Sequence, residues 1–178
     1  KIKKNPISDA LAKKALYLLG SNLKIAVEEP KNKSARENML LGSTLAGMAF
    51  ANAPCAAVHA LAYPVGATFH VPHGLSNSLV LLEVLKFNSS VAENLYCDIA
   101  EDCIPNLRGK NIKISDFIQG MEELIQDLKI PNKLKDVGIS HKDIPKLAED
   151  ALKQQRLLIN NPKQVKLQDA ISIYTASL

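Results

Sequence analysis

The stretch from Met39 to about Tyr63 is almost uniformly small or apolar, and it constrains the fold more than any other feature of the chain. A helix that is apolar on all sides belongs in the middle of a domain. Pro54 lies inside this stretch and predicts a kink. Many of its residues are small enough for neighbouring helices to approach closely: Gly42, Ser43, Ala46, Gly47, Ala49, Ala51, Ala53, Ala56, Ala57 and Ala60. We therefore expect this helix at the centre of an all-α domain.

Helical spacing of apolar residues dominates the rest of the chain, and no segment is convincing as a strand. The first helix is expected from Pro6, with a possible interruption at Gly20-Ser21-Asn22, and the second from a capping box at Ser34-Ala-Arg-Glu37. Tyr63-Pro64-Val-Gly66 and Pro72-His73-Gly74 predict two breaks. Beyond them we expect helices over residues 75–87 with an end at Asn88, and over 90–102, 114–128, 140–158 and 167–177.

Length and composition fit a helical bundle. The chain has 178 residues, enough for one domain, or one domain with a small appendage. It contains no Trp and only four Phe and four Tyr, so its core must consist mainly of Leu, Ile, Val and Ala.

The charge pattern argues against a nucleic-acid partner. The net charge of +4 is spread along the chain, and Lys1, Lys3 and Lys4 form its one tight basic cluster. No basic stripe with interleaved aromatic residues occurs, so these charges predict a solvated helix surface. No segment approaches the roughly 20 apolar residues of a membrane span, and the N-terminus lacks a signal-peptide pattern, so we expect no membrane partner.

The three cysteines argue against a disulfide framework. Cys55, Cys97 and Cys103 are odd in number and have no Cys-x-x-Cys spacing, which also disfavours a structural zinc site. This pattern favours the reducing cytoplasm. Cys55 lies in an alanine-rich run and is expected to be a small core residue.

Three of the four histidines fall within fifteen positions: His59, His70 and His73. On one continuous helix His59 and His73 would lie about 21 Å apart. A turn at Pro64 and Gly66 can bring the two imidazoles to one point, with His59 near the end of one helix and His73 at the start of the next. From the residues alone, these side chains are either a metal or catalytic site or histidines satisfied within a core.

Several motifs around these histidines carry a family resemblance. They are Gly47-Met-Ala-Phe-Ala-Asn52, Val58-His59-Ala-Leu-Ala62 and Pro72-His73-Gly74-Leu-Ser-Asn77, followed by a Leu-rich helix. The chain thereby resembles the iron-containing alcohol dehydrogenases, a family of the dehydroquinate synthase-like superfamily. Further matching segments, from Asn5-Pro-Ile-Ser-Asp9 through Leu85-Lys-Phe-Asn88 to Asn161-Pro162, extend the resemblance over nearly the whole chain.

The resemblance implies a two-domain enzyme, of which residues 1–178 are the all-helical, metal-binding C-terminal domain. An N-terminal α/β domain would bind NAD or NADP and is not in this chain. The family holds its metal with an Asp and a His of an Asp-x-x-x-His helix and with two later histidines. Those later two match His59 and His73, and the resemblance places the Asp-x-x-x-His element shortly before Lys1.

The implied activity is the interconversion of a small-molecule alcohol and an aldehyde or ketone by hydride transfer. Fe²⁺ is the metal that the resemblance implies, and Zn²⁺ suits the same ligands. The resemblance is also the basis for expecting NAD or NADP as cofactor. A homo-oligomer is expected because a truncated two-domain protein exposes the apolar face that meets its partner domain. We expect the isolated chain to be inactive.

Two departures from the family pattern bear on the site. Tyr63 stands where many members have a further His near the cofactor, and a phenol is a poor proton relay at neutral pH. Pro54 replaces a residue that is usually compatible with an unbroken helix. Nearby, His70 either contacts the substrate or a metal ligand, or faces solvent. Phe69 is a candidate wall of the pocket.

Two other functions remain open. Within enzymes, the chain could belong to a zinc-dependent relative that resembles glycerol dehydrogenase. In a different class, it could be a degenerate helical oligomerisation module without activity. The fourth histidine, His141, lies at a polar helix start and is expected at the surface.

Overall fold

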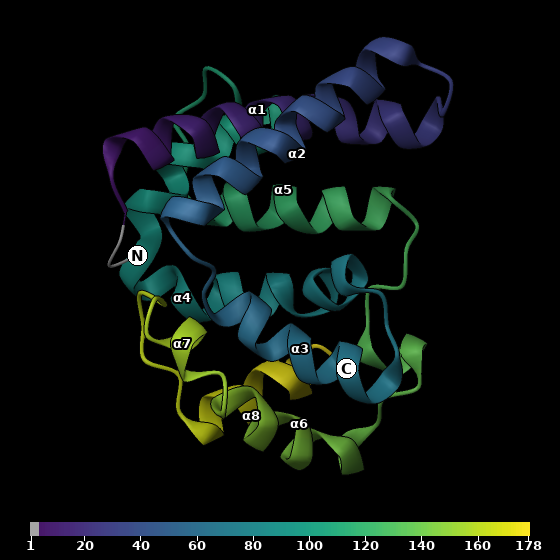
Figure 1. Ribbon diagram of the computed structural model, residues 1–178, viewed down its shortest axis with the longest axis vertical. Helices are drawn as coiled ribbons and strands as arrows, with labels where there is room; N and C mark the ends of the chain where they lie inside the picture. The colour runs from purple at the N-terminus through teal and green to yellow at the C-terminus, as the bar shows by residue number, and fades with distance from the viewer. Residues whose placement is uncertain (1–3) are drawn as a thin grey trace. The chain divides into compact units, whose positions relative to one another are not determined.

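The computed structural model describes residues 4–178, and this part of the chain is helical and without strands (Figure 1). The helices are α1 (Pro6–Glu28), α2 (Lys33–Asn52), α3 (Ala57–Phe69), α4 (His73–Cys103), α5 (Ile114–Asp127), α6 (Ile144–Leu152), α7 (Gln155–Leu158) and α8 (Leu167–Ala176). Short 3-10 helices are η1 (Pro105–Leu107), η2 (Leu134–Val137) and η3 (His141–Asp143). The predicted all-α fold is confirmed.

Contacts divide the described residues into two compact units. One consists of Cys55–Val91 and Lys129–Leu178, with α3, the start of α4, α6, α7 and α8. We call it the histidine unit because it contains both His59 and His73. The other consists of the described residues up to Pro54 together with Ala92–Leu128, and we call it the α1–α2 unit.

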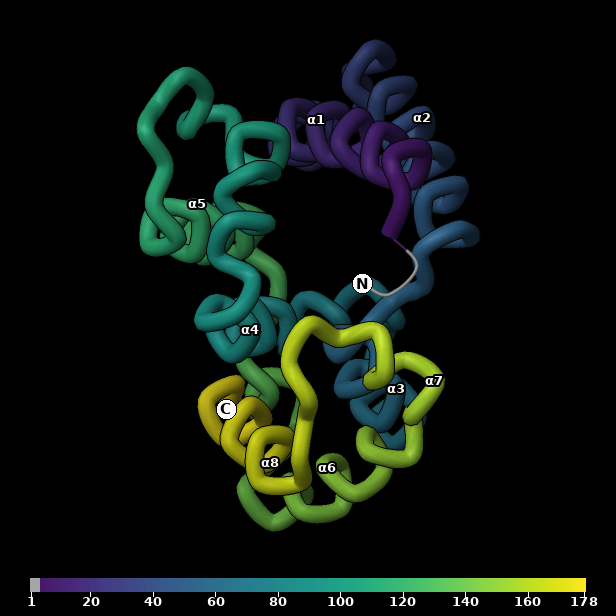
Figure 2. The backbone as a smooth tube through the Cα atoms, turned by 90° about the vertical axis from the view of Figure 1, so that its left-hand side faces the viewer, coloured from purple at the N-terminus to yellow at the C-terminus, as the bar shows by residue number. Residues whose placement is uncertain are grey.

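The α1–α2 unit is built on two long helices that lie side by side (Figure 1, Figure 2). The Asn5 side chain accepts a hydrogen bond from the backbone N–H of Ser8 at 2.9 Å, which caps the start of α1. The predicted capping box at Ser34 is wrong. Instead α2 begins at Lys33, because the Asn32 side chain accepts the N–H of Ala35 at 3.0 Å and so starts the helix earlier.

Helix α1 is continuous through Gly20, so the interruption expected there is wrong. A Cβ atom at residue 20 would lie only 2.3 Å from the carbonyl oxygen of Cys103, at the end of α4. Glycine is therefore needed for close approach of two backbones and does not mark a turn. Within this unit Lys24 also pairs with Asp127 of α5 at 2.7 Å, and Arg108 lies over the Tyr17 ring at 4.3 Å.

Replacing Gly20 by Ala should lower the free energy of unfolding by about 1–3 kcal/mol, because the new methyl group cannot be accommodated beside the Cys103 carbonyl. Gly47→Ala in α2 is the matched control, since a Cβ at residue 47 meets nothing within 4 Å. It should raise the free energy of unfolding by about 0.5–1 kcal/mol through helix propensity. Urea unfolding of both variants measures the two changes, and a Gly20→Ala variant as stable as the parent would refute the packing role.

Helix α4 runs without a break from His73 to Cys103, so the end predicted at Asn88 is wrong. Asn88 is buried and its amide pairs with that of Asn161 in two reciprocal hydrogen bonds of 3.1 and 2.8 Å. This side chain is thus used to join two segments of the histidine unit and not to cap a helix.

The stop predicted at Tyr63-Pro64-Val-Gly66 is also wrong, because α3 continues to Phe69 with Pro64 inside it. Gly66 serves a close approach: its Cβ position is 3.3 Å from both the Ser76 Oγ and the Val71 carbonyl oxygen. The chain reverses instead at His70, which ends α3 in the left-handed conformation with φ of 56°. The kink expected at Pro54 is a complete break between α2 and α3.

The stretch from Met39 to Tyr63 is not one central helix. Its first part lies in α2, where Leu40 and Phe50 are exposed, and only its second part, in α3, is buried in a core.

The remaining helix predictions are largely confirmed. α5 and α8 match the expected ranges, and α6 follows η3, where the Asp143 carboxylate accepts hydrogen bonds from the backbone N–H and hydroxyl of Ser140. These bonds hold the pKa of Asp143 below its usual value. The helix expected over 140–158 is divided, since α6 ends at Leu152 and α7 begins at Gln155.

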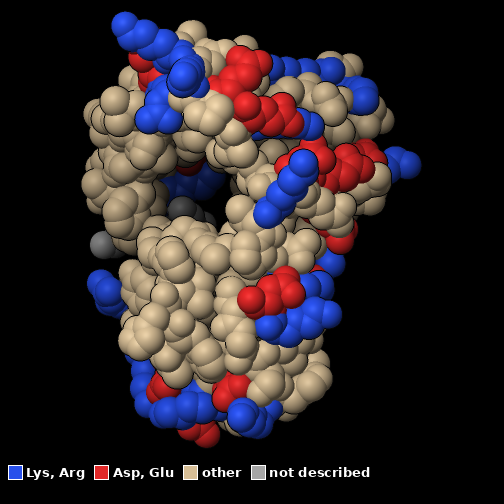
Figure 3. Space-filling model, turned by 90° about the vertical axis from the view of Figure 1, so that its right-hand side faces the viewer, with Lys and Arg blue, Asp and Glu red and all other residues tan. Residues whose placement is uncertain are grey.

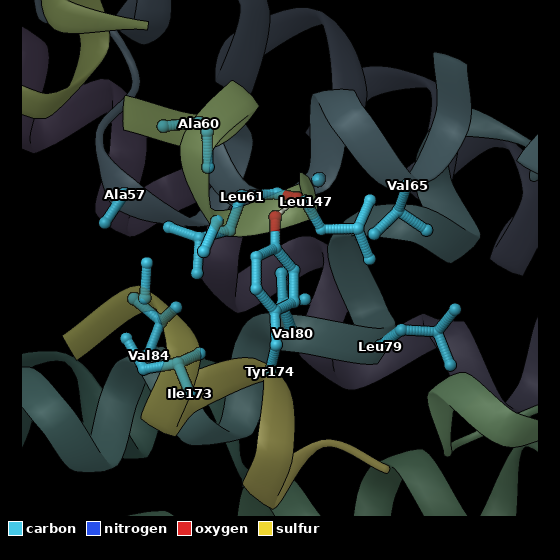
Figure 4. Packing of buried hydrophobic residues seen from close by; sticks show 14 of the residues in the cluster. Ala57, Ala60, Leu61, Val65, Leu79, Val80, Val84, Leu147, Ile173 and Tyr174 are labelled. Carbon is cyan, nitrogen blue, oxygen red and sulfur yellow. Dashed lines mark hydrogen bonds between the residues drawn. The ribbon is translucent and has the colours of Figure 1, made fainter. Parts of the chain in front are cut away.

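The core of the histidine unit gathers around α3. Leu61 and Val65 of α3 pack with Val80 of α4, Leu147 of α6 and Tyr174 of α8, and all five side chains are fully buried (Figure 4). The Tyr174 hydroxyl donates a hydrogen bond of 2.6 Å to the carbonyl oxygen of Leu61. Burial raises the pKa of Tyr174 far above its ordinary value, so the phenol stays protonated and remains a donor.

Tyr174→Phe removes this buried hydrogen bond without changing the ring. We expect the free energy of unfolding to fall by about 1–2 kcal/mol, because a buried carbonyl loses a partner. Tyr17→Phe, at a 42% exposed position, is the control and should change stability little. Chemical denaturation compares the two, and equal stabilities would show that the bond is dispensable.

Among the described helices no single one is long and apolar enough to cross a membrane. The pair α2 and α3 meets such a criterion only when taken together as a bent pair, by length and composition. Charged side chains of both signs are interspersed on the face that Figure 3 presents.

Candidate metal centre

The candidate metal ligands, His59 and His73, lie in the first turns of α3 and α4 in the histidine unit. His59 lies in the first turn of α3, Tyr63 follows one turn later on the same side of that helix, and His73 is the first residue of α4. The sequence predicts the convergence, but it wrongly places His59 near a helix end. The reversal at His70 returns the chain against α3, where the Ser76 hydroxyl lies close to Gly66, and it brings the His73 ring next to the His59 ring.

The three rings form a compact group. The His59 and His73 ring centroids are 5.2 Å apart, with their planes inclined by 59°. The Tyr63 ring lies 5.9 Å from that of His73 and 6.3 Å from that of His59. His59 and Tyr63 are half-buried and His73 is exposed, so the group lies at the surface of its unit. The opposite side of α3 is buried in the core through Ala57, Ala60 and Leu61.

The separation of the two imidazoles fits a shared metal ion. An imidazole nitrogen binds Zn²⁺ at about 2.0–2.1 Å, which puts two ring centroids roughly 5 Å apart at a tetrahedral angle. The observed 5.2 Å meets that requirement. Among residues 4–178, however, no group of three or more His, Cys, Asp or Glu side chains is placed to hold a metal. A metal ion bound between His59 and His73 would therefore need further ligands from outside the described residues.

Cys55 approaches the site from the segment before α3. Its Sγ lies 3.6 Å from Nε2 of His59, within the reach of a hydrogen bond that involves sulfur. The thiol thus occupies the surroundings of a nitrogen that could bind a metal. Cys55 also packs against the core cluster, in agreement with its prediction as a small core residue.

Asn77, one turn after His73 in α4, contacts the other candidate ligand. Its Nδ2 donates a hydrogen bond of 2.9 Å to the His73 carbonyl oxygen and lies 3.2 Å from Nε2 and 3.5 Å from Nδ1 of the ring. Its Oδ1 is buried and has no hydrogen-bond partner among the described residues.

The other predicted residues lie around this group without joining it. Phe69 is half-buried and packs against the core cluster. His70 is exposed and forms the left-handed turn between α3 and α4. His141 is exposed at the start of η3, as predicted.

Sequence reasoning missed the contacts of Cys55 and Asn77 with the two histidines. The available signal is spacing, because Cys55 precedes His59 by four residues and Asn77 follows His73 by four. Within a helix such spacing places two side chains on the same face, which applies to His73 and Asn77 in α4, whereas Cys55 precedes the start of α3.

Comparisons with known proteins agree with this geometry. The sequence profile described as "Fe-containing alcohol dehydrogenase family, C-terminal" matches residues 1–178. A 1,3-propanediol dehydrogenase of Klebsiella pneumoniae is 37% identical over 172 residues, which cover 96% of this chain and 44% of that protein. The chain thus spans less than half the length of this relative.

Solved structures of longer proteins contain the same fold. A crystal structure of a 1,3-propanediol oxidoreductase superposes with a TM-score of 0.92 at 35% identity, covering 99% of this chain and 46% of the other. A sulfoacetaldehyde reductase of Bifidobacterium kashiwanohense, in complex with NAD⁺, superposes with a TM-score of 0.83 at 26% identity and covers 97% of this chain and 44% of the other.

The Cys55 contact makes a prediction about reactivity. A metal on His59 should slow alkylation of the Cys55 thiol by iodoacetamide, because an ion on Nε2 would bind or cover a sulfur atom 3.6 Å away. Peptide mass spectrometry of the chain with and without Co²⁺ measures the rate at each cysteine. Cys97 is the internal control, and burial raises the pKa of Cys103 to about 12, so its thiol should not react. Unchanged Cys55 alkylation at saturating Co²⁺ would contradict metal binding at His59.

Proposed function

Because the chain belongs to the Fe-containing alcohol dehydrogenase family, we propose that it forms the metal-binding part of an NAD(P)-dependent enzyme that interconverts an alcohol and an aldehyde or ketone. The observation that carries this proposal is the 5.2 Å separation of the His59 and His73 rings. Relatives named as a propanediol dehydrogenase and a sulfoacetaldehyde reductase support the substrate class, and the NAD⁺ complex of the latter supports the cofactor.

In this proposal His59 and His73 supply two nitrogen ligands. The Asp-x-x-x-His element that the family uses for its other two ligands does not occur in the 178 residues. A divalent iron held by such nitrogen and carboxylate ligands would act as a Lewis acid toward the alcohol or carbonyl oxygen. Zn²⁺ suits the same ligands, so Fe²⁺ is preferred on the ground of family membership.

The chain's own residues would orient and enclose the reacting groups. α3 fixes His59 and Tyr63 because the opposite side of the helix is anchored in the core. The Tyr63 hydroxyl would donate a hydrogen bond at the site. Neutral imidazoles would leave a divalent site net positive, which favours an anionic form of the substrate. The nicotinamide of NAD or NADP would accept or give the hydride.

A chimera tests the activity. The C-terminal part of the Klebsiella 1,3-propanediol dehydrogenase that aligns with this chain is replaced by residues 1–178, and alcohol-dependent reduction of NAD⁺ is assayed with added Fe²⁺ or Zn²⁺. We expect turnover. His73→Ala or His59→Ala should then lower kcat/KM by at least about a hundredfold, because the metal contributes several kcal/mol to transition-state stabilisation.

His141→Ala is the matched control and should leave the chimera active, since His141 is exposed and distant in sequence from both ligands. The isolated chain is a second control, from which we expect no turnover. A folded chimera that is inactive, or one that tolerates loss of both His59 and His73, would contradict the proposal. Metal analysis of the active chimera separates an iron enzyme from a zinc-dependent, glycerol dehydrogenase-like one.

The alternative of a helical oligomerisation module has one observation in its favour. α2 carries four large apolar side chains that are at least half exposed: Leu40, Leu41, Met48 and Phe50. These side chains support self-association of the chain. They give no reason for two imidazoles and a phenol to converge elsewhere, so the enzymatic role is preferred.

A further inference from the structure

The amide of Asn77 has a hydrogen-bond partner for only one of its two polar atoms among the described residues. Its nitrogen already has a backbone acceptor in the His73 carbonyl, yet its oxygen is buried without a partner among the described residues. A buried polar atom without a hydrogen bond is costly and calls for an explanation. The nearest ring to this amide is that of His73, whose nitrogens lie 3.2 and 3.5 Å from Nδ2.

The orientation suits a metal-free imidazole and not a metal-bound one. A neutral imidazole has one acceptor nitrogen and one N–H donor. In the absence of a metal, Nδ2 can donate to the acceptor nitrogen. When a metal occupies that nitrogen, the ring presents only its remaining N–H, and two donors then face each other. A metal-bound histidine requires an acceptor at this place.

We propose that Asn77 is a positioning residue for His73, and that its Oδ1 accepts a hydrogen bond from the ring N–H of His73 when a metal is bound. Half a turn of the amide about its Cβ–Cγ bond exchanges Nδ2 and Oδ1. Because two acceptors repel, Oδ1 then moves from the His73 carbonyl toward the ring. That carbonyl keeps a partner, since it also accepts the helical backbone N–H four residues later in α4.

This inference rests on the proposed function, because it assumes that His73 binds a metal. It explains both why Oδ1 of Asn77 is buried without a partner among the described residues and why the amide lies beside the His73 ring. In the metal-bound state, this oxygen would be the acceptor for the ring N–H. The bond would fix which ring nitrogen carries the proton and would hold the ring in the orientation that the metal requires. Loss of such an outer partner typically weakens metal affinity 10–100-fold.

Three variants of the chimera described above, whose relative-derived part would supply the other ligands, separate the proposed role of Asn77 from a purely structural one. Asn77→Leu removes both the acceptor and the donor, and Asn77→Asp keeps an acceptor but loses the donor to the His73 carbonyl. Asn52→Leu is the matched control, because Asn52 makes the same local bond, from Nδ2 to the Met48 carbonyl at 2.9 Å, without a histidine. Co²⁺ affinity is measured by titration of the visible absorption, and thermal unfolding in chelator checks that each variant folds.

We expect Asn77→Leu to bind Co²⁺ about 10–100-fold more weakly than the parent, and Asn77→Asp to bind at least as tightly. Asn52→Leu should be unchanged. The second measurement is ¹H–¹⁵N NMR of the histidine rings in the Zn²⁺-loaded chimera. The ring N–H proton of His73 should be protected from exchange in the parent and exposed in Asn77→Leu, an effect that a purely structural role of Asn77 would not produce.

Parental affinity in a folded Asn77→Leu variant would overturn the inference. So would an Asn77→Asp variant as weak as Asn77→Leu, because the donor bond to the carbonyl would then be what matters. In both cases the metal centre itself would stand, provided that Co²⁺ binding depends on His73. If the parent chimera binds no Co²⁺ through His73, the proposed metal centre fails and the role of Asn77 fails with it.

Discussion

The position of the candidate site depends on the burial of one face of α3. That helix places Ala57, Ala60 and Leu61 in the core, where its Leu61 carbonyl accepts the hydroxyl of Tyr174 from α8. A helix held on one side by close packing and by a buried hydrogen bond has little freedom to rotate about its axis. His59 and Tyr63 lie on the other side of α3, so the same packing restricts the positions of their side chains. The geometry of the candidate site is thus set by apolar packing and not by the polar residues themselves.

Small residues make the second contribution, by letting segments approach where a side chain would intervene. Gly66 lies against the Ser76 hydroxyl and the Val71 carbonyl, so the turn after α3 folds back closely on the helix. Gly20 does the same between α1 and the end of α4 in the other unit. In both cases the residue resembles a helix breaker in the sequence, but it lies within a helix and serves packing.

The site has the properties of one half of a ligand set. Two imidazoles lie at a separation suited to one ion, with a thiol beside one and an amide beside the other. In the proposed function they supply part of the coordination, and the family's other two ligands are assigned to a segment outside these 178 residues. The unsatisfied Asn77 oxygen fits the same picture, because its hydrogen bond would form only in the metal-bound state.

The sequence by itself determined the all-α class and the family, because long apolar runs and extended motifs are local signals. It also predicted that His59 and His73 converge, but through a turn at Pro64 and Gly66, whereas the chain reverses at His70. It also located α5 and α8 closely. Tertiary structure decided where helices end. Asn88 predicts a helix end and Gly20 an interruption, but Asn88 pairs with Asn161 and Gly20 packs against the Cys103 backbone. Both partners are distant in the chain. It likewise decided which groups adjoin the histidines. A side chain's partner depends on how packing orients each helix, and local sequence does not encode that orientation.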